Sequence, residues 1–190
     1  GMLAIAQFAG VMRPSRQAYS FRVNSREEFK LTYDYVSRAK SEVLVVPRPA
    51  SSRKQLGKIE HLLARCATDR GYAPYVIAYV RIDELDRIGV SWPEHQIVAY
   101  AKEPPQQSFI VVDRRTIVLM PADTAASGDH WIVSVFENDY QAAEEYAAGF
   151  MAAWRRAHDA SVEDLAQIHF ARRQDDRFVV LMFEADDEAA

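Results

Sequence analysis

The chain has 190 residues, 49% hydrophobic and 26% charged, which is typical of one globular domain with its own core and not of a disordered chain. The net charge of −4 gives no general attraction for nucleic acid, and no apolar run approaches the roughly 18 residues that cross a membrane. The single cysteine, Cys66, excludes an internal disulfide and a cysteine-based zinc site. We therefore expect a cytoplasmic protein without a metal or another cofactor.

The two ends of the chain are predicted to lie outside the main domain. The predicted parts are an N-terminal segment at 1–24, a single α/β domain at 25–184 and an acidic tail at 185–190. Gly1 resembles a cloning scar, and the apolar stretch 2–12 lacks the basic lead of a signal peptide. This stretch predicts an edge strand or a docking segment. Residues 13–24 are polar and predict irregular structure.

The domain begins with a helix and a buried strand. Ser25 and Glu28 have the spacing of a capping box, in which two side chains bond each other's free backbone amides, and they predict a helix at 26–40. The continuous apolar run 43–46 is stopped by prolines on either side of Arg48. A strand that is apolar on both faces is typical of the middle of a sheet covered by helices.

Helices and strands then alternate to the end of the domain. The predicted elements are a helix that Ser51 and Ser52 open and Gly71 caps, strands at 74–80, 96–100, 109–112, 116–120 and 131–136, helices at 140–158 and 162–168, and a strand at 177–183. The long helix, capped by Asn138 or Asp139, has one apolar stripe, which consists of Tyr140, Ala143, Ala147, Phe150 and Trp154. This pattern predicts an α/β fold with a mixed β-sheet flanked by helices.

The order of these elements resembles half of a phospholipase D domain. The segments that carry the resemblance are SEVLVV, PYVIAYV, QIVAYA, the hairpin SFIVVDRRTIVLM, WIVSVF and the helix that ends in FMAAW, and they span about 28–154. The resemblance implies a phospholipase D-like half-module. Small members with one motif pair two halves across one site, so we expect a homodimer.

The motif of this family is incomplete in the chain. Active members carry His-x-Lys-x4-Asp, in which the histidine attacks phosphorus, the lysine holds the phosphoryl oxygens and the aspartate supports the site. Alignment on Asp113 places Gln106 at the histidine and Ser108 at the lysine. Glutamine is not a comparable nucleophile and serine carries no charge, so we expect no catalysis by this mechanism. The candidate pocket comprises Gln106, Ser108, Asp113, His130 and Arg48.

The resemblance leaves three functions open. Modules without the motif occur as sensor domains of archaeal sugar-responsive transcription regulators, which predicts a non-catalytic sensory or interaction domain that binds a small ligand or a protein partner. Those regulators carry a DNA-binding helical domain, and we expect none here, so that a signal would pass through a partner chain. The alternative is a phosphodiesterase or nuclease with a site rebuilt around Asp113 and His130 or His95. A nucleic-acid-binding regulator acting through pairs such as Arg114 and Arg115 is the third, and we do not expect it.

Overall fold

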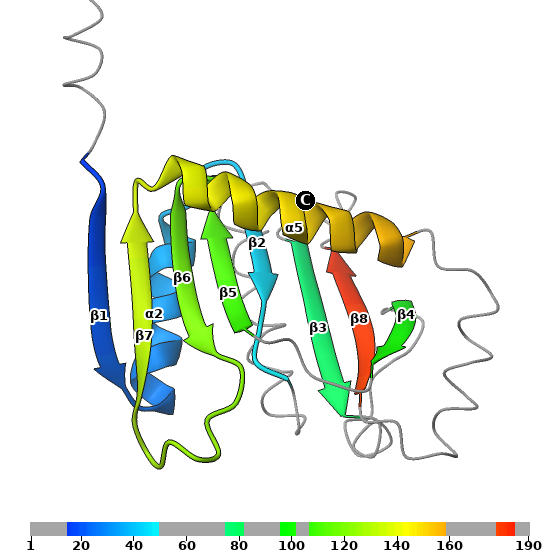
Figure 1. Cartoon of the computed structure of the whole chain (residues 1–190), viewed down its shortest axis with the longest axis horizontal. Coiled ribbons are helices and arrows are strands. Elements are labelled where there is room, and N and C mark those ends of the chain that lie inside the picture. Colours follow the sequence, from blue (N-terminus) through cyan, green and yellow to red (C-terminus); the bar gives the residue numbers. More distant parts are fainter. Residues whose placement is uncertain (1–14, 50–74, 82–95, 102–106, 159–177, 185–190) are drawn as a thin grey trace, which may run out of the picture.

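A computed structural model describes residues 15–49, 75–81, 96–101, 107–158 and 178–184, which form one sheet and two helices (Figure 1). In chain order the elements are β1 (Gln17–Val23), α2 (Ser25–Ser37), β2 (Val43–Val46), β3 (Tyr75–Arg81), β4 (Gln96–Ala101), β5 (Gln107–Val112), β6 (Thr116–Pro121), β7 (Trp131–Glu137), α5 (Tyr140–His158) and β8 (Phe178–Glu184). No helix within these ranges is long and apolar enough to span a membrane.

The sheet is mixed, with strand order β1-β7-β6-β5-β2-β3-β8-β4. The β2–β3 pair is parallel and all other described pairs are antiparallel. The short strand β2 lies between β5 and β3, and all four of its residues are buried, as its continuous apolar run predicts. The predicted α/β fold with a mixed sheet flanked by helices is thus confirmed.

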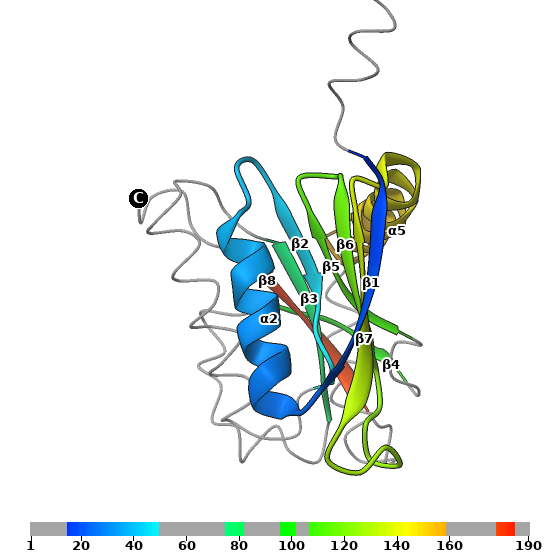
Figure 2. The same ribbon diagram turned by 90° about the vertical axis from the view of Figure 1, so that its left-hand side faces the viewer.

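The two helices cover opposite faces of the sheet (Figure 2). Because side chains alternate along a strand, Leu44 and Val46 pack toward α5 while Val43 and Val45 point to the other face, where α2 lies. The predicted stripe of α5 is buried except for its first residue, Tyr140, which is 39% exposed. The buried members are Ala143, Ala147, Phe150 and Trp154.

Strand β1 differs from the expectation of irregular structure at 13–24. It pairs antiparallel along all of β7, from Gln17 opposite Glu137 to Val23 opposite Trp131, and is the outermost strand on that side of the sheet. The prediction failed because an edge strand buries little: only Val23 is buried. The alternation of Tyr19, Phe21 and Val23 was the available signal.

The cap of α2 lies one residue earlier than predicted. The side-chain oxygen of Asn24 accepts a hydrogen bond from the Glu27 amide at 2.8 Å, and the Glu27 side chain accepts one from the Asn24 amide at 3.1 Å. The capping box therefore uses Asn24 and Glu27, and the assignment to Ser25 and Glu28 is wrong. This shift leaves the Glu28 side chain available for another role.

Several predicted features lie outside the described residues. These are the apolar stretch 2–12, the helix between Ser51 and Gly71 with Cys66, His95, Gln106, the helix at 162–168 and the tail at 185–190. The remaining predicted strands are all present, with ends that differ by one or two residues. Of the two proposed caps of α5, Asp139 acts as one: its carboxylate accepts a hydrogen bond from the Ala142 amide at 3.2 Å.

Candidate functional site

Three of the predicted pocket residues lie at one end of the strands, where β2 ends and β5 and β7 begin. The two rims of the sheet that the strand ends form are called its edges below. Arg48 follows β2, Ser108 is the second residue of β5, and His130 directly precedes β7. The antiparallel pairing of β2 with β5 places Val46 opposite Phe109, which brings the segment after β2 to the start of β5. This edge also contains the beginning of α2 (Figure 2).

The strongest polar contact at this edge joins Arg48 to Glu28 of α2. The two guanidinium Nη atoms donate to the two carboxylate oxygens at 2.9 and 2.7 Å, and Arg48 Nε donates to the Pro121 carbonyl at 3.1 Å. The side chains of Arg48 and Glu28 are only 23% and 10% exposed. A bidentate, charge-assisted pair of this kind fixes the start of α2 against the sheet edge.

Trp131 completes this contact. Its indole Nε1 donates to Glu28 Oε1 at 3.0 Å, and the Arg48 guanidinium carbon lies 4.9 Å from the centre of its ring. Glu28 and Trp131 are not among the predicted pocket residues, because the sequence pattern placed Glu28 in the helix cap. Once Asn24 and Glu27 are taken as the capping box, Glu28 is an acid with no role in the cap. This was the signal that could have identified Glu28 as a pocket residue.

Ser108 is fully buried in β5. Its side chain points to the same face as Ile110 and Val112, and it lies opposite Met120 of β6. Among the residues that the structure describes, its hydroxyl oxygen has no hydrogen-bond partner. A buried hydroxyl without a partner costs about 1 to 3 kcal/mol relative to a bonded one. No base within the described ranges lies in hydrogen-bond reach of Ser108 to activate it as a nucleophile.

His130 lies at the surface. Its Nε2 is 3.9 Å from Glu27 Oε1, and both side chains are exposed. Ion pairs of this length at a surface contribute little to stability. Within the described residues, no group of three or more His, Cys, Asp and Glu side chains is arranged to hold a metal ion.

Asp113 lies at the opposite end of the strands, in the β5–β6 turn. Five residues of extended chain separate it from Ser108, roughly 16 Å. Its carboxylate accepts hydrogen bonds from the amides of Lys40, Ser41 and Glu42 at 2.9, 2.8 and 3.0 Å, and from the Ser41 hydroxyl at 2.9 Å. Asp113 therefore ties the α2–β2 connection to the turn, and it does not meet His130 in one site.

These hydrogen bonds also set the charge state of Asp113. Burial alone would raise the pKa of its carboxyl group, but the bonds from Glu42, Ser41 and Lys40 stabilise the carboxylate more strongly and hold the pKa below its usual range. Asp113 and the next residue, Arg114, both have φ of 52°, as in a turn with left-handed residues. Aspartate tolerates this conformation better than most residues.

No family model and no curated protein matches the chain. Among solved structures, it resembles TrmBL2, described as an archaeal chromatin protein with a novel mode of DNA binding, at a TM-score of 0.46 and 15% identity over 82% of this chain and 59% of that one. It also resembles NucT from Helicobacter pylori (TM-score 0.45, 10% identity, 75% and 98% of the two chains). A third match is Nuc from Salmonella typhimurium, a phospholipase D family member (TM-score 0.44, 11% identity, 75% of this chain and 96% of that one).

These similarities concern the fold. The chain spans 59% of the length of TrmBL2 but nearly all of the two shorter proteins. A phospholipase D family member is thus among the structures that resemble this chain, as the sequence resemblance predicts.

The Arg48–Glu28 pair predicts a specific loss of stability. Replacement of Glu28 by Gln leaves the guanidinium of Arg48 without its countercharge, and we expect the free energy of unfolding to fall by about 2 to 4 kcal/mol. Urea unfolding followed by circular dichroism measures it. The control is Glu27→Gln, since glutamine preserves the capping box and that side chain is exposed. Equal effects of the two substitutions would contradict the buried pair.

Asp113 predicts a pH-dependent contribution to stability. Asp113→Asn removes the charge that the turn amides stabilise, and we expect a loss of about 1 to 2 kcal/mol at pH 7, reduced by partial exposure. Because the folded-state pKa is lowered, this contribution is present above the unfolded pKa of about 3.9 and is lost as the pH falls through the folded value. The difference between wild type and variant, measured by urea unfolding, should therefore shrink below about pH 4.

The exposed Asp129 offers the control for this measurement. We expect Asp129→Asn to change stability by less than about 0.5 kcal/mol at either pH. If the free energy of unfolding of the Asp113 variant stayed below that of the wild type by the same amount from pH 7 to pH 3, the charge of Asp113 would not be what the hydrogen bonds stabilise.

Proposed function

We propose that the chain is a non-catalytic, phospholipase D-like sensory or interaction domain that binds a small ligand or a protein partner. The observation that carries this proposal is the burial of Ser108. The resemblance implies a lysine at this position, whose ammonium group must reach the phosphoryl oxygens and neutralise their developing charge. A buried, neutral and unpartnered hydroxyl does neither.

The nearest described cation does not replace that lysine. Arg48 directs both Nη atoms to the Glu28 carboxylate, so that its charge is already balanced and its donors are engaged. Its Nε is also bonded, to the Pro121 carbonyl. A phosphodiester would have to compete with a bidentate carboxylate for this guanidinium. The arrangement supports a structural role for Arg48 at the edge where the catalytic group is expected.

Nucleic acid is not part of the proposal. In the arginine pair of the β5–β6 turn, Arg114 is neutralised by the protein's own acids, since it contacts Glu42 at 2.9 Å and Glu144 at 3.7 Å, so the pair does not present two free charges. Arginines that bind phosphates need charge that is free to displace counterions. The DNA binding described for TrmBL2 is a property of that protein.

The test of the proposal is hydrolysis of bis(p-nitrophenyl) phosphate by the purified chain, with and without Mg²⁺ or Mn²⁺. We expect no turnover above that of a heat-denatured sample. Ser108→Ala and His130→Ala are assayed beside the wild type, since these residues would be the nucleophile or the base of a rebuilt site. Turnover that copurifies with the protein would overturn the proposal. Its loss in one variant would identify the residue responsible.

We also propose that the chain forms a homodimer, as small one-motif members of the phospholipase D family, which the chain resembles, do. Two-fold dimers are the commonest closed assemblies. Size-exclusion chromatography with light scattering at micromolar concentration should give about twice the 21.6 kDa of one chain. A mass near 21.6 kDa across a tenfold range of concentration would refute the dimer.

A further inference from the structure

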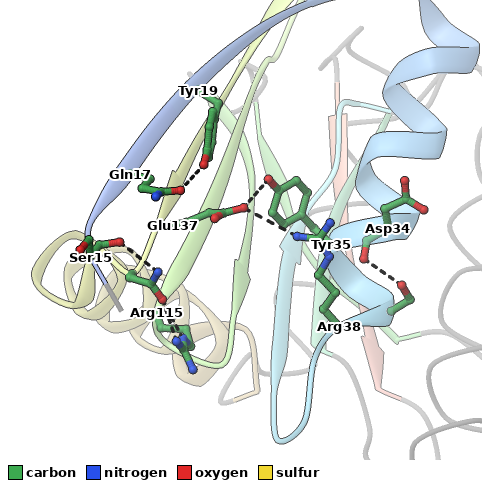
Figure 3. Close-up of polar contacts among 10 residues, drawn as sticks. Ser15, Gln17, Tyr19, Asp34, Tyr35, Arg38, Arg115 and Glu137 are labelled. Carbon is green, nitrogen blue, oxygen red and sulfur yellow. Dashed lines mark hydrogen bonds and ion pairs between the residues drawn. The ribbon is translucent and has the colours of Figure 1, made fainter. Parts of the chain in front are cut away.

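A polar pocket lies at the sheet edge that contains Asp113, opposite the edge of Ser108. It has a volume of about 220 Å³ and opens between the end of α2, the β5–β6 turn and the end of β7 (Figure 3). Its lining residues are Tyr35, Arg38, Lys40, Val112, Asp113, Arg115, Thr116, Glu137 and Asn138. Pockets for drug-sized ligands measure about 300 to 1,000 Å³, so this one suits a smaller molecule.

Three cationic residues line the pocket, and one of them faces only a neutral partner. Arg115 donates from Nε and Nη2 to the side-chain oxygen of Asn138 at 3.2 and 2.7 Å, and its guanidinium carbon lies 5.8 Å from the centre of the Tyr140 ring. An amide oxygen accepts hydrogen bonds but does not neutralise a full positive charge. Within the described part of the chain, no carboxylate lies within ion-pair distance of Arg115.

The two acids of the pocket are already engaged. The Asp113 carboxylate is bonded to the Lys40–Glu42 turn, and Glu137 Oε1 accepts a hydrogen bond from the Tyr35 hydroxyl at 2.7 Å (Figure 3). The same Glu137 oxygen is 3.7 Å from Arg38 Nη1, a long contact to a side chain that is 64% exposed. The charge of Arg38 is therefore only weakly balanced.

Tyr35 keeps its proton and so remains a donor to Glu137. Burial and the hydrogen bond to Glu137 raise the pKa of its hydroxyl to about 12. Two formal negative charges thus face three positive ones, which are Arg38, Lys40 and Arg115. Among the described lining residues, the pocket therefore has an excess of formal positive charge.

The backbone around the pocket is held in place. Asn138 has φ of 58° where β7 passes into α5, and its side-chain Nδ2 donates to the Ser15 carbonyl at 3.2 Å while its Oδ1 accepts from Arg115. Figure 3 shows Arg115 below the contact to Ser15, and Arg38 and Tyr35 on α2 across the pocket. A guanidinium held in this way loses little conformational freedom when a ligand binds.

We propose that this pocket binds a small oxyanion, a carboxylate or a phosphate, between Arg115 and Arg38. Oxygen atoms of such a ligand would accept hydrogen bonds from the guanidinium groups that line the pocket, and Lys40, which also lines it, would add positive charge. The inference rests on the proposed function only in treating the chain as a ligand-binding domain. Anion binding here is measured separately from phosphodiester hydrolysis at the other edge, so either proposal can fail without the other.

The test is isothermal titration calorimetry of the full chain with inorganic phosphate and, separately, with succinate, at constant ionic strength set by sodium chloride. We expect one of the two anions to bind with one site per chain, and the comparison tells which oxyanion the pocket prefers. Arg115→Gln should weaken that binding at least tenfold, because glutamine can still bond Asn138 but carries no charge. Arg155→Gln, on the exposed side of α5, should bind like the wild type.

Arg38→Gln provides a second variant, at a side chain that is 64% exposed, and it should also weaken binding. Circular dichroism confirms that each variant is folded. No heat from either anion would overturn the inference. So would affinities of the Arg115 and Arg38 variants equal to that of the wild type, since binding would then occur elsewhere.

Discussion

The carboxylate of Asp113 joins two connections of the chain that lie far apart in sequence. It sits in the turn between β5 and β6, yet its hydrogen bonds come from the three residues that lead from α2 into β2. Because β2 and β5 are neighbours in the sheet, this one side chain holds the end of α2 above the strands it covers. Both polar sites depend on that position of the helix. One is closed by Tyr35 and Arg38 near its end, and the other by Glu28 near its beginning.

The secondary structure could be predicted where one residue class dominates a segment. The run 43–46 is apolar throughout and forms a strand with those bounds, and α5 begins at Tyr140 because Asp139 caps it and apolar residues follow at helical spacing. Strand β1 escaped prediction because its partner, β7, lies more than a hundred residues later in the chain and leaves most of β1 exposed. Its strand character comes from pairing and not from its own composition.

The candidate site was harder to predict than the fold. Sequence spacing indicates which residues share a face of one strand, but the predicted strand began at 109 and did not include Ser108, which is the second residue of β5. Spacing does not indicate that Arg48 is bonded to Glu28, or that Arg115 faces an amide instead of an acid. Those facts arise from contacts between elements. They decide which cations are neutralised and which are available, and with them the chemistry that each edge of the sheet can support.

The pairing of β1 with β7 has a consequence for the synthesis of the protein. A ribosome must add roughly 110 residues after Val23 before Trp131 emerges, which takes about 5 to 20 s at usual rates of translation. Throughout that interval β1 has no strand beside it, and Tyr19 and Phe21 lie on a segment with unpaired backbone groups. The nascent chain thus presents an unpaired strand long before the strand that pairs with it has been made.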